Sequence, residues 1–403
     1  MDFNDTPEEA AYRAQVRAWL AANAPGGVQG DDEDPNNMAA AKAWQAKKAD
    51  AGYACITWRK DWGGPGGAPW QSVIFAQEEA DIPTPGNPFS IGLGMCVPTI
   101  MTSGNEADKV RFVKPAMRGE EIWCQLFSEP SGGSDVAAAR TRAVRDGDEW
   151  VINGQKVWTS GAHYSDFGLL LARTDPDVPK HKGLTMYWID MHDPAVECRP
   201  IHQMSGASNF NEVYFTNLRI KDSQRVGPVG DGWKVSLVTL MNERMSIGGG
   251  GGGDYRPVMK LAQELSTLVG PAVKDAALRE KIAEWFVQAE GLKYTRFRAQ
   301  TALSRGQVPG PENSIGKVVG ATLMQDMAQA AMDMEDQFGI INDPKHAPLA
   351  AAFQAAVMGA PGMRIAGGTD EILRNIIAER VLGLPGDVRL DKDVAFKDIP
   401  SGR

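Results

Sequence analysis

One carboxylate is placed unusually in the segment Leu240–Ile247, which reads LMNERMSI and runs directly into six glycines at 248–253. Glu243 has apolar neighbours on both sides, namely Leu237, Leu240, Met241, Met245 and Ile247. Apolar surroundings raise the pKa of a carboxylate and make it a stronger base. The segment therefore raises the question of whether Glu243 is a functional carboxylate in an apolar pocket or an exposed glutamate on a fraying helix, and the rest of the chain has to decide it.

The elements that must position this carboxylate follow a helical, then β, then helical order. Thr6-Pro7-Glu8-Glu9 is a capping box that predicts the start of a helix. From about residue 121, Asp-Gly at 146–147 and Asn-Gly at 153–154 lie between β-rich runs and each gives a hairpin signal. Long helical patterns return after Trp233.

This order predicts three domains, at residues 1–120, 121–230 and 231–403. The expected strands include FGLLLAR, LTMYWIDM, VECRPI and NEVYFTNLRI. The expected C-terminal helices cover Ala272–Leu303, Asn313–Gln337 and the run TDEILRNIIAERVLGL.

Composition excludes several classes of protein. The 403 residues are 43% hydrophobic and 23% charged, as in ordinary globular chains. Four scattered cysteines and five scattered histidines show no metal-ligand spacing and fit a reducing compartment. A net charge of −9 argues against nucleic acid as a partner. With no signal-peptide pattern at the start and no long apolar run, we expect a cytoplasmic protein without a membrane span.

Four motifs carry a resemblance to a known family. They are CQLFSEPSGGSD at 124–135, INGQKVWTSGA at 152–162, MNER at 241–244 and GGTDEILRN at 367–375. The first alone fits a plain glycine-rich loop equally well, and a tryptophan within a strand is more often a core residue. Together, in this order and spacing, the four resemble the acyl-CoA dehydrogenase family over most of the chain.

The resemblance implies a mainly α fold with a central β-barrel: a helical bundle, the β domain and a four-helix bundle. It implies FAD between the β domain and the C-terminal helices. It also implies α,β-oxidation of an acyl-CoA in fatty acid or lipid catabolism, with electrons passed to an electron-transfer flavoprotein. A homodimer or homotetramer is the expected assembly.

The resemblance also assigns the cofactor contacts. Phe127 and Ser128 are expected at the flavin edge, Trp158 against the isoalloxazine ring, and Ser134 against both cofactor and substrate. Glu371 stands where the family often has Gln, and we expect Arg374 to pair with it on a helix. The expected cofactor-binding residues are Gln125, Phe127, Ser128, Gly133, Ser134, Trp158, Thr159, Ser160, Thr369 and Glu371.

The resemblance bears on the role of Glu243. Many family members carry the base two residues before a Thr, where this chain has Gly367, which cannot take a proton. A second branch, including isovaleryl- and long-chain-type enzymes, carries it immediately before an Arg, as in Glu243-Arg244. We therefore expect Glu243 to be the base, flavin N5 the hydride acceptor, and the Gly367 N–H an oxyanion donor. The expected substrate-binding residues are Ser134, Asn242, Arg244 and Gly367.

Two departures from the family pattern affect the adenosine half of the FAD site. The usual Arg-x-x-Phe-Gly motif is replaced within QELSTLVGPAVKD, and the usual Gln-x-x-Gly-Gly segment reads Gln337–Ile341, QFGII. The glycines at 248–253 predict either a close-packed stretch or a loosened turn.

An acyl-CoA oxidase and a non-catalytic or heteromeric subunit of this family are the alternative functions. The identity of the acyl chain is open.

Overall fold

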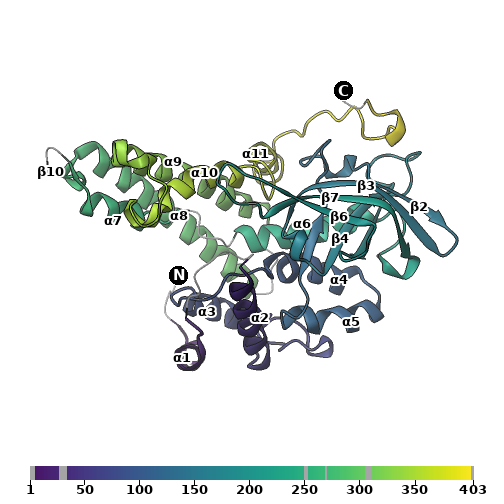
Figure 1. Cartoon of the computed structure of the whole chain (residues 1–403), viewed down its shortest axis with the longest axis horizontal. Helices are drawn as coiled ribbons and strands as arrows, with labels where there is room; N and C mark the ends of the chain where they lie inside the picture. Colours follow the sequence, from purple (N-terminus) through teal and green to yellow (C-terminus); the bar gives the residue numbers. More distant parts are fainter. Residues whose placement is uncertain (1–4, 27–33, 249–252, 268–269, 305–309, 401–403) are drawn as a thin grey trace. The chain divides into compact units, whose positions relative to one another are not determined.

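The computed structural model describes residues 5–26, 34–248, 253–267, 270–304 and 310–400 (Figure 1). The chain divides into two compact units. The first contains residues 1–202, 208–242 and 389–403, and the second contains residues 203–207 and 243–388. No helix in the described ranges combines the length and the apolar character needed to cross a membrane.

In the described part of the chain, five α-helices precede the sheet of the first unit. The predicted capping box begins the first helix: the Glu9 N–H donates to Thr6 Oγ1 at 3.3 Å and the Thr6 N–H donates to Glu9 Oε2 at 2.8 Å. Aromatic rings of this region pack together, with Trp19 and Trp44 stacked at 5.3 Å between centroids. The helices are α1 (Pro7–Asn23), α2 (Pro35–Asp50), α3 (Pro69–Glu79), α4 (Val97–Ser103) and α5 (Glu106–Met117).

An eight-stranded mixed sheet completes the first unit. Its order is β6-β7-β3-β2-β4-β5-β8, and β1 pairs in parallel with β4. The expected β-barrel is not confirmed, because β6 and β8 end this path and do not pair within the described residues. The strands are β1 (Trp123–Leu126), β2 (Arg142–Asp146), β3 (Glu149–Ser160), β4 (Phe167–Arg173), β5 (Leu184–Asp190), β6 (Val196–Ile201), β7 (Phe210–Lys221) and β8 (Arg225–Val226).

Only one of the two predicted hairpin turns is confirmed. Asp146 and Glu149 are paired across a tight turn in which Gly147 has a φ of +67°. At Asn153-Gly154 the prediction is wrong, because β3 continues through it with a register shift instead of turning. Gly154 is needed there for space: a Cβ would lie 2.6 Å from Thr141 Oγ1.

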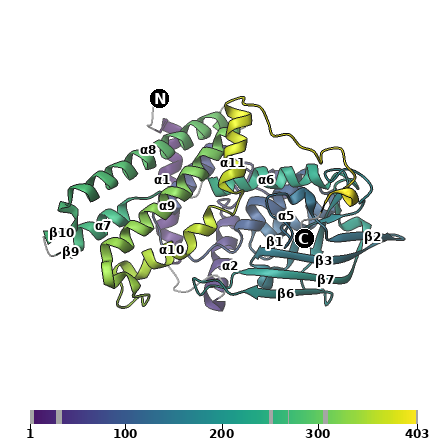
Figure 2. The ribbon, with the colours of Figure 1, turned by 90° about the horizontal axis from the view of Figure 1, so that it is seen from above.

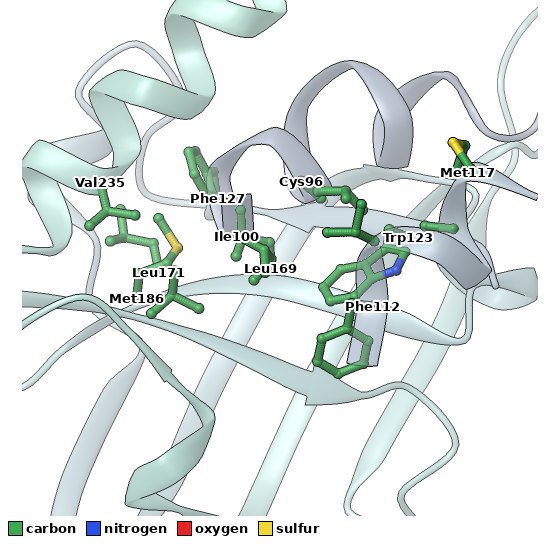
Figure 3. Close-up of a cluster of buried hydrophobic side chains, with 14 of the residues drawn as sticks. Cys96, Ile100, Phe112, Met117, Trp123, Phe127, Leu169, Leu171, Met186 and Val235 are labelled. Carbon is green, nitrogen blue, oxygen red and sulfur yellow. The ribbon is translucent and has the colours of Figure 1, made fainter. Parts of the chain in front are cut away.

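The main core of the first unit lies between helices α4 and α5 and one face of the sheet. Ile100 and Phe112 from the helices pack against Leu169 and Leu171 of β4, and all four are at most 1% exposed. Figure 3 shows these side chains with Trp123, whose ring meets the Phe112 ring edge-on at 5.0 Å. This packing fixes β4 and the neighbouring β1, from which the first predicted cofactor segment leads.

The second unit is helical. Helix α9 lies between α8 and α10 (Figure 2). Trp285 of α8 is buried among them and donates its indole N–H to Asp326 Oδ2 at 2.7 Å. The helices are α7 (Arg256–Glu264), α8 (Ala276–Ser304), α9 (Ser314–Glu335), α10 (Ala352–Met363) and α11 (Asp370–Ile376), with a small hairpin of β9 (Ser266–Thr267) and β10 (Gly270–Pro271).

Helix α6 (Gly232–Gly248) begins in the first unit and enters the second at Glu243. The glycines at 249–252 lie outside the described residues. Gly253, the last of the run, has a φ of +108°, and a Cβ there would lie 2.6 Å from Leu323 Cδ2. Leu323 Cδ2 is the end of a flexible side chain, so the close-packed stretch and the loosened turn both stay predictions.

Candidate active site

The first predicted cofactor segment leaves the end of β1 with its side chains divided between core and surface. Gln125 is half-buried on β1, and the Phe127 side chain is only 4% exposed within the main core (Figure 3). Ser128 is half-buried, while Gly133 and Ser134 are exposed. The loop thus leaves its glycine and serine groups accessible above a residue that is anchored in the core.

A buried ion pair lies directly behind this loop. Lys156 of β3 donates from Nζ to Glu129 Oε1 at 2.7 Å, and the Lys156 side chain is fully buried. Burial raises the pKa of Glu129, but the charge and hydrogen bonds of Lys156 and two backbone N–H groups outweigh it and leave this pKa below its usual value. Glu129 is therefore a carboxylate at neutral pH.

The second predicted cofactor segment presents an exposed aromatic ring beside a buried hydroxyl. Trp158 is 58% exposed and has a φ of +59°, which is rare for a bulky residue. Within the described residues its ring meets the Phe210 ring edge-on, with 6.0 Å between the centroids. Thr159 is 1% exposed, and in the described chain its Oγ1 has no hydrogen-bond partner. Ser160 is half-buried at the end of the same strand.

Buried hydroxyls are normally hydrogen-bonded, so the unpaired Oγ1 of Thr159 calls for a partner. An exposed tryptophan ring supplies a flat apolar surface next to it. A flavin offers both a flat ring and hydrogen-bonding edge atoms. The residues of this segment therefore fit the cofactor that the sequence predicts.

Glu243 and the predicted glycine segment share one cationic neighbour in the second unit. Glu243 is half-buried on α6. The charge of Glu243 acts on Lys317 of α9, whose Nζ donates a hydrogen bond to the carbonyl oxygen of Gly368. Lys317 is therefore hydrogen-bonded to the turn that contains Gly367 and also interacts electrostatically with Glu243. Asn242 is half-buried in the first unit, and the Arg244 side chain lies outside the described residues.

The glycine segment is a tight turn closed by an ion pair. Gly367 and Gly368 have φ values of +66° and +91°, which glycine adopts without steric cost. Arg364 Nε donates to Asp370 Oδ2 at 2.7 Å across the turn. Thr369 then caps α11, accepting a hydrogen bond from the Ile372 N–H at 3.3 Å. Its hydroxyl is thus engaged in capping.

Glu371 does not form the expected close ion pair with Arg374 in this part of the described chain. Hydrogen bonds from its own N–H and from the Thr369 hydroxyl lower the pKa of Glu371, and Arg364 and Arg374 add to this by charge alone. The exposed carboxylate therefore stays ionised.

Three residues around the turn escaped the sequence reasoning: Lys317, Arg364 and Asp370. Lys317 lies far from the glycines in sequence, and its helix shows no motif. Asp370 lies within the GGTDEILRN segment and is 3% exposed. Helical periodicity along this segment was the signal that could have placed Asp370 on the buried face.

Family models of the acyl-CoA dehydrogenases match almost the whole chain. The N-terminal domain model matches residues 6–120, the middle domain model residues 124–218 and the C-terminal domain model residues 230–382. The structure is also similar to a solved structure described as the Tcur3481-Tcur3483 steroid ACAD. The TM-score is 0.79 at 25% sequence identity, covering 96% of this chain and all of that chain.

Two curated relatives come from Mycobacterium tuberculosis. Acyl-CoA dehydrogenase IpdE1 is 35% identical over 94% of this chain and 98% of its own length. Acyl-CoA dehydrogenase FadE34 is 37% identical over 85% of this chain, but the match spans only 46% of FadE34.

The two segments of the first unit fit a flavin, and the family matches identify the class as a flavoprotein oxidoreductase. The chain belongs to the acyl-CoA dehydrogenase family, whose members depend on FAD. The resemblance drawn from four motifs is thereby confirmed at the level of the family.

Proposed function

We propose that this protein oxidises an acyl-CoA thioester to the α,β-unsaturated thioester, with Glu243 as the base. The observation that carries the proposal is the position of Lys317. Its ammonium group donates a hydrogen bond to the Gly368 carbonyl oxygen and interacts electrostatically with Glu243. A carboxylate whose charge acts on the lysine bound to the glycine turn can supply the base that Gly367 lacks. This supports, for this chain, the branch of the family with the base on the first C-terminal helix.

The residues of this chain divide the work. Glu243 takes the proton from Cα as electrons move into the forming C=C bond. The Gly367 N–H, together with its turn, stabilises the thioester oxygen while negative charge develops there. FAD, when bound, supplies the acceptor for the hydride that leaves Cβ. Ser134, Asn242 and Arg244 are the proposed contacts for the rest of the thioester.

The proposed cofactor site uses the two segments of the first unit. Trp158 provides the ring surface, and Thr159 and Ser160 provide hydroxyls at the flavin edge. Gln125, Phe127, Ser128, Gly133 and Ser134 are the proposed FAD contacts from the first segment, with Phe127 fixed through its buried side chain. Thr369 and Glu371 are proposed for the distal part of FAD. The division at 1–120, 121–230 and 231–403 and the electron-transfer flavoprotein as acceptor are part of the same proposal.

A steroid-derived acyl group is our first choice for the substrate. The similar structure of the Tcur3481-Tcur3483 steroid ACAD supports this choice. The name of that structure joins two proteins, which favours the alternative of a heteromeric subunit over a homodimer or homotetramer for this chain.

The substrate is tested by mixing the FAD-loaded protein anaerobically with short, branched, aromatic and steroid side-chain acyl-CoAs. We expect bleaching of the flavin absorbance, fastest with the steroid thioesters. No bleaching with any thioester would contradict the proposed activity. Reoxidation by electron-transfer flavoprotein rather than by oxygen separates a dehydrogenase from an acyl-CoA oxidase. Mass measurement of the native assembly after co-expression with neighbouring homologues tests the heteromer.

A further inference from the structure

The buried pair of Glu129 and Lys156 connects the two predicted flavin segments. Their side chains are 5% and 0% exposed, and the Nζ–Oε1 distance is 2.7 Å. Burying two charges costs more free energy than such a pair usually returns, so it is weak evidence for stability alone. Its hydrogen bonds show what else it does.

Glu129 closes the loop that carries the first segment. Its Oε2 accepts from the Arg140 N–H at 2.6 Å, and its Oε1 accepts from the Thr141 N–H at 2.9 Å. Glu129 also forms a tight turn with Gly132, through backbone hydrogen bonds of 3.1 and 2.9 Å in the two directions. One carboxylate therefore holds both the start and the end of the loop that contains Gly133 and Ser134.

Lys156 fastens this loop to the second segment. Besides Glu129, its ammonium group donates to the carbonyl oxygen of Phe127 at 3.0 Å. The next residue, Val157, donates its N–H to the Ser128 carbonyl at 2.9 Å. Trp158 and Thr159 follow immediately, so the ring and hydroxyl of the second segment are set relative to Phe127 and Ser128 through these bonds.

We propose that Glu129 and Lys156 are positioning residues that lock the two flavin-binding segments into one rigid site. The proposal rests on the cofactor contacts proposed above, but not on the identity of the base or of the acyl group. Neither side chain needs to touch FAD. The pair acts by fixing the loop at 129–141 and the strand end at 156–160 at one spacing.

The test compares Lys156→Met with the parent protein, because methionine has a similar length and no charge. We expect the dissociation constant for FAD, measured by titrating the apoprotein and following flavin fluorescence, to rise by about tenfold or more. We also expect trypsin to cut after the exposed Arg140 more rapidly in the Lys156→Met apoprotein than in the parent apoprotein. Without Lys156, Glu129 holds the N–H groups of Arg140 and Thr141 less firmly. The cut is identified by the mass of the fragments.

The matched control is Arg219→Met. Arg219 lies on β7 and pairs with Glu149 of β3 at 2.8 Å, but it is 51% exposed. This variant loses the same charge from the same sheet, so its FAD affinity and its cleavage after Arg140 are expected to match the parent.

A purely structural role predicts a different pattern: a lower unfolding temperature, with parental FAD affinity in the folded protein and parental cleavage after Arg140. That pattern would overturn the proposal. If Lys156→Met does not fold, Glu129→Asp carries the same test, because the shorter carboxylate cannot hold both N–H groups at once. Unchanged FAD affinity in a folded Glu129→Asp variant would equally overturn it. Because FAD binding and cleavage are read without acyl-CoA, failure here is distinct from failure of Glu243 as the base.

Discussion

The ammonium group of Lys317 donates a hydrogen bond to the carbonyl oxygen of Gly368, which ties helix α9 to the glycine turn before α11. Burial lowers the pKa of Lys317, while the carboxylates of Asp370, Glu371 and Glu243 partly oppose this shift. This lysine thus links the proposed base to the proposed oxyanion donor. We therefore expect a substitution of Lys317 to affect the rate of flavin reduction more than the affinity for FAD.

Replacing Lys317 with methionine should release the Gly368 carbonyl and disorder the turn around the Gly367 N–H. We expect the rate of flavin reduction by acyl-CoA in anaerobic stopped-flow to fall by about tenfold, the value of one hydrogen bond to a charged group. FAD affinity should stay within about twofold of the parent, because sites that share no contact usually change each other's free energies by no more than this. Lys281→Met on α8, where the side chain is 50% exposed, is the control. An unaltered reduction rate in Lys317→Met would show that the contact is incidental.

Trp158 should matter for FAD binding and little for the apoprotein. Its ring is 58% exposed, so Trp158→Ala removes few packing contacts from the fold itself. We expect FAD to bind about tenfold more weakly, because the flavin loses a stacking surface. Apoprotein unfolding by urea and FAD titration measure the two effects separately. Equal loss of stability with and without FAD would show that Trp158 is only a structural residue.

Gly367 should resist substitution because of its backbone. At a φ of +66°, an alanine costs about 1–2 kcal/mol of unfolding free energy. A shifted turn would also misplace the N–H, and we expect Gly367→Ala to reduce its flavin with acyl-CoA about tenfold more slowly or worse. Gly359→Ala in α10 is the control, since a Cβ there meets nothing within 4 Å. It should keep the parental rate; a parental rate in both variants argues against Gly367 as an oxyanion donor.

Glu335 should make the second unit less stable as the pH rises. It is 1% exposed and accepts from Gln354 Nε2 at 2.7 Å, but its Oε1 and the Gln354 Oε1 have no partner among the described residues. Burial raises the pKa of Glu335, so the native state binds this proton more tightly than the unfolded state does. Its contribution to stability is therefore full below the ordinary pKa of 4.5 and is lost as the pH rises through the raised value.

Glu335→Gln should remove this dependence, because the new amide can donate to the Gln354 Oε1. We expect a gain on the order of 1 kcal/mol at pH 7 and a smaller difference at pH 4.5, measured by urea unfolding. The exposed Glu280→Gln on α8 should show no such trend. A variant that is less stable than the parent at pH 7 would mean that a cation stabilises the Glu335 carboxylate.

Local patterns predicted most of the elements. The strand runs from FGLLLAR to NEVYFTNLRI and the helices near Ala272–Leu303 and Asn313–Gln337 all appear where alternation and helical periodicity put them. Asn153-Gly154 was mistaken for a turn because its dipeptide signal is the same as that of a hairpin. Only the approach of Thr141 explains why glycine is needed inside the strand.

What the sequence could not supply are relationships between distant segments. Closure of a sheet depends on which edge strands meet, and neither β6 nor β8 carries a mark of its neighbour. Lys317 and Gly368 are 51 residues apart, and Glu129 and Lys156 are 27 apart. No spacing rule joins such pairs, although Glu129 and Lys156 both lie in motifs that predict flavin segments.

The most direct measurement of the central claim is anaerobic flavin reduction in Glu243→Gln, with Glu264→Gln on α7 as the exposed control. Glutamine keeps the size of the side chain and cannot take the α proton. We predict that Glu243→Gln binds FAD like the parent but reduces it with acyl-CoA about 10²- to 10⁴-fold more slowly, while Glu264→Gln is unaffected. Reduction of the Glu243→Gln flavin at the parental rate would contradict the assignment of the base.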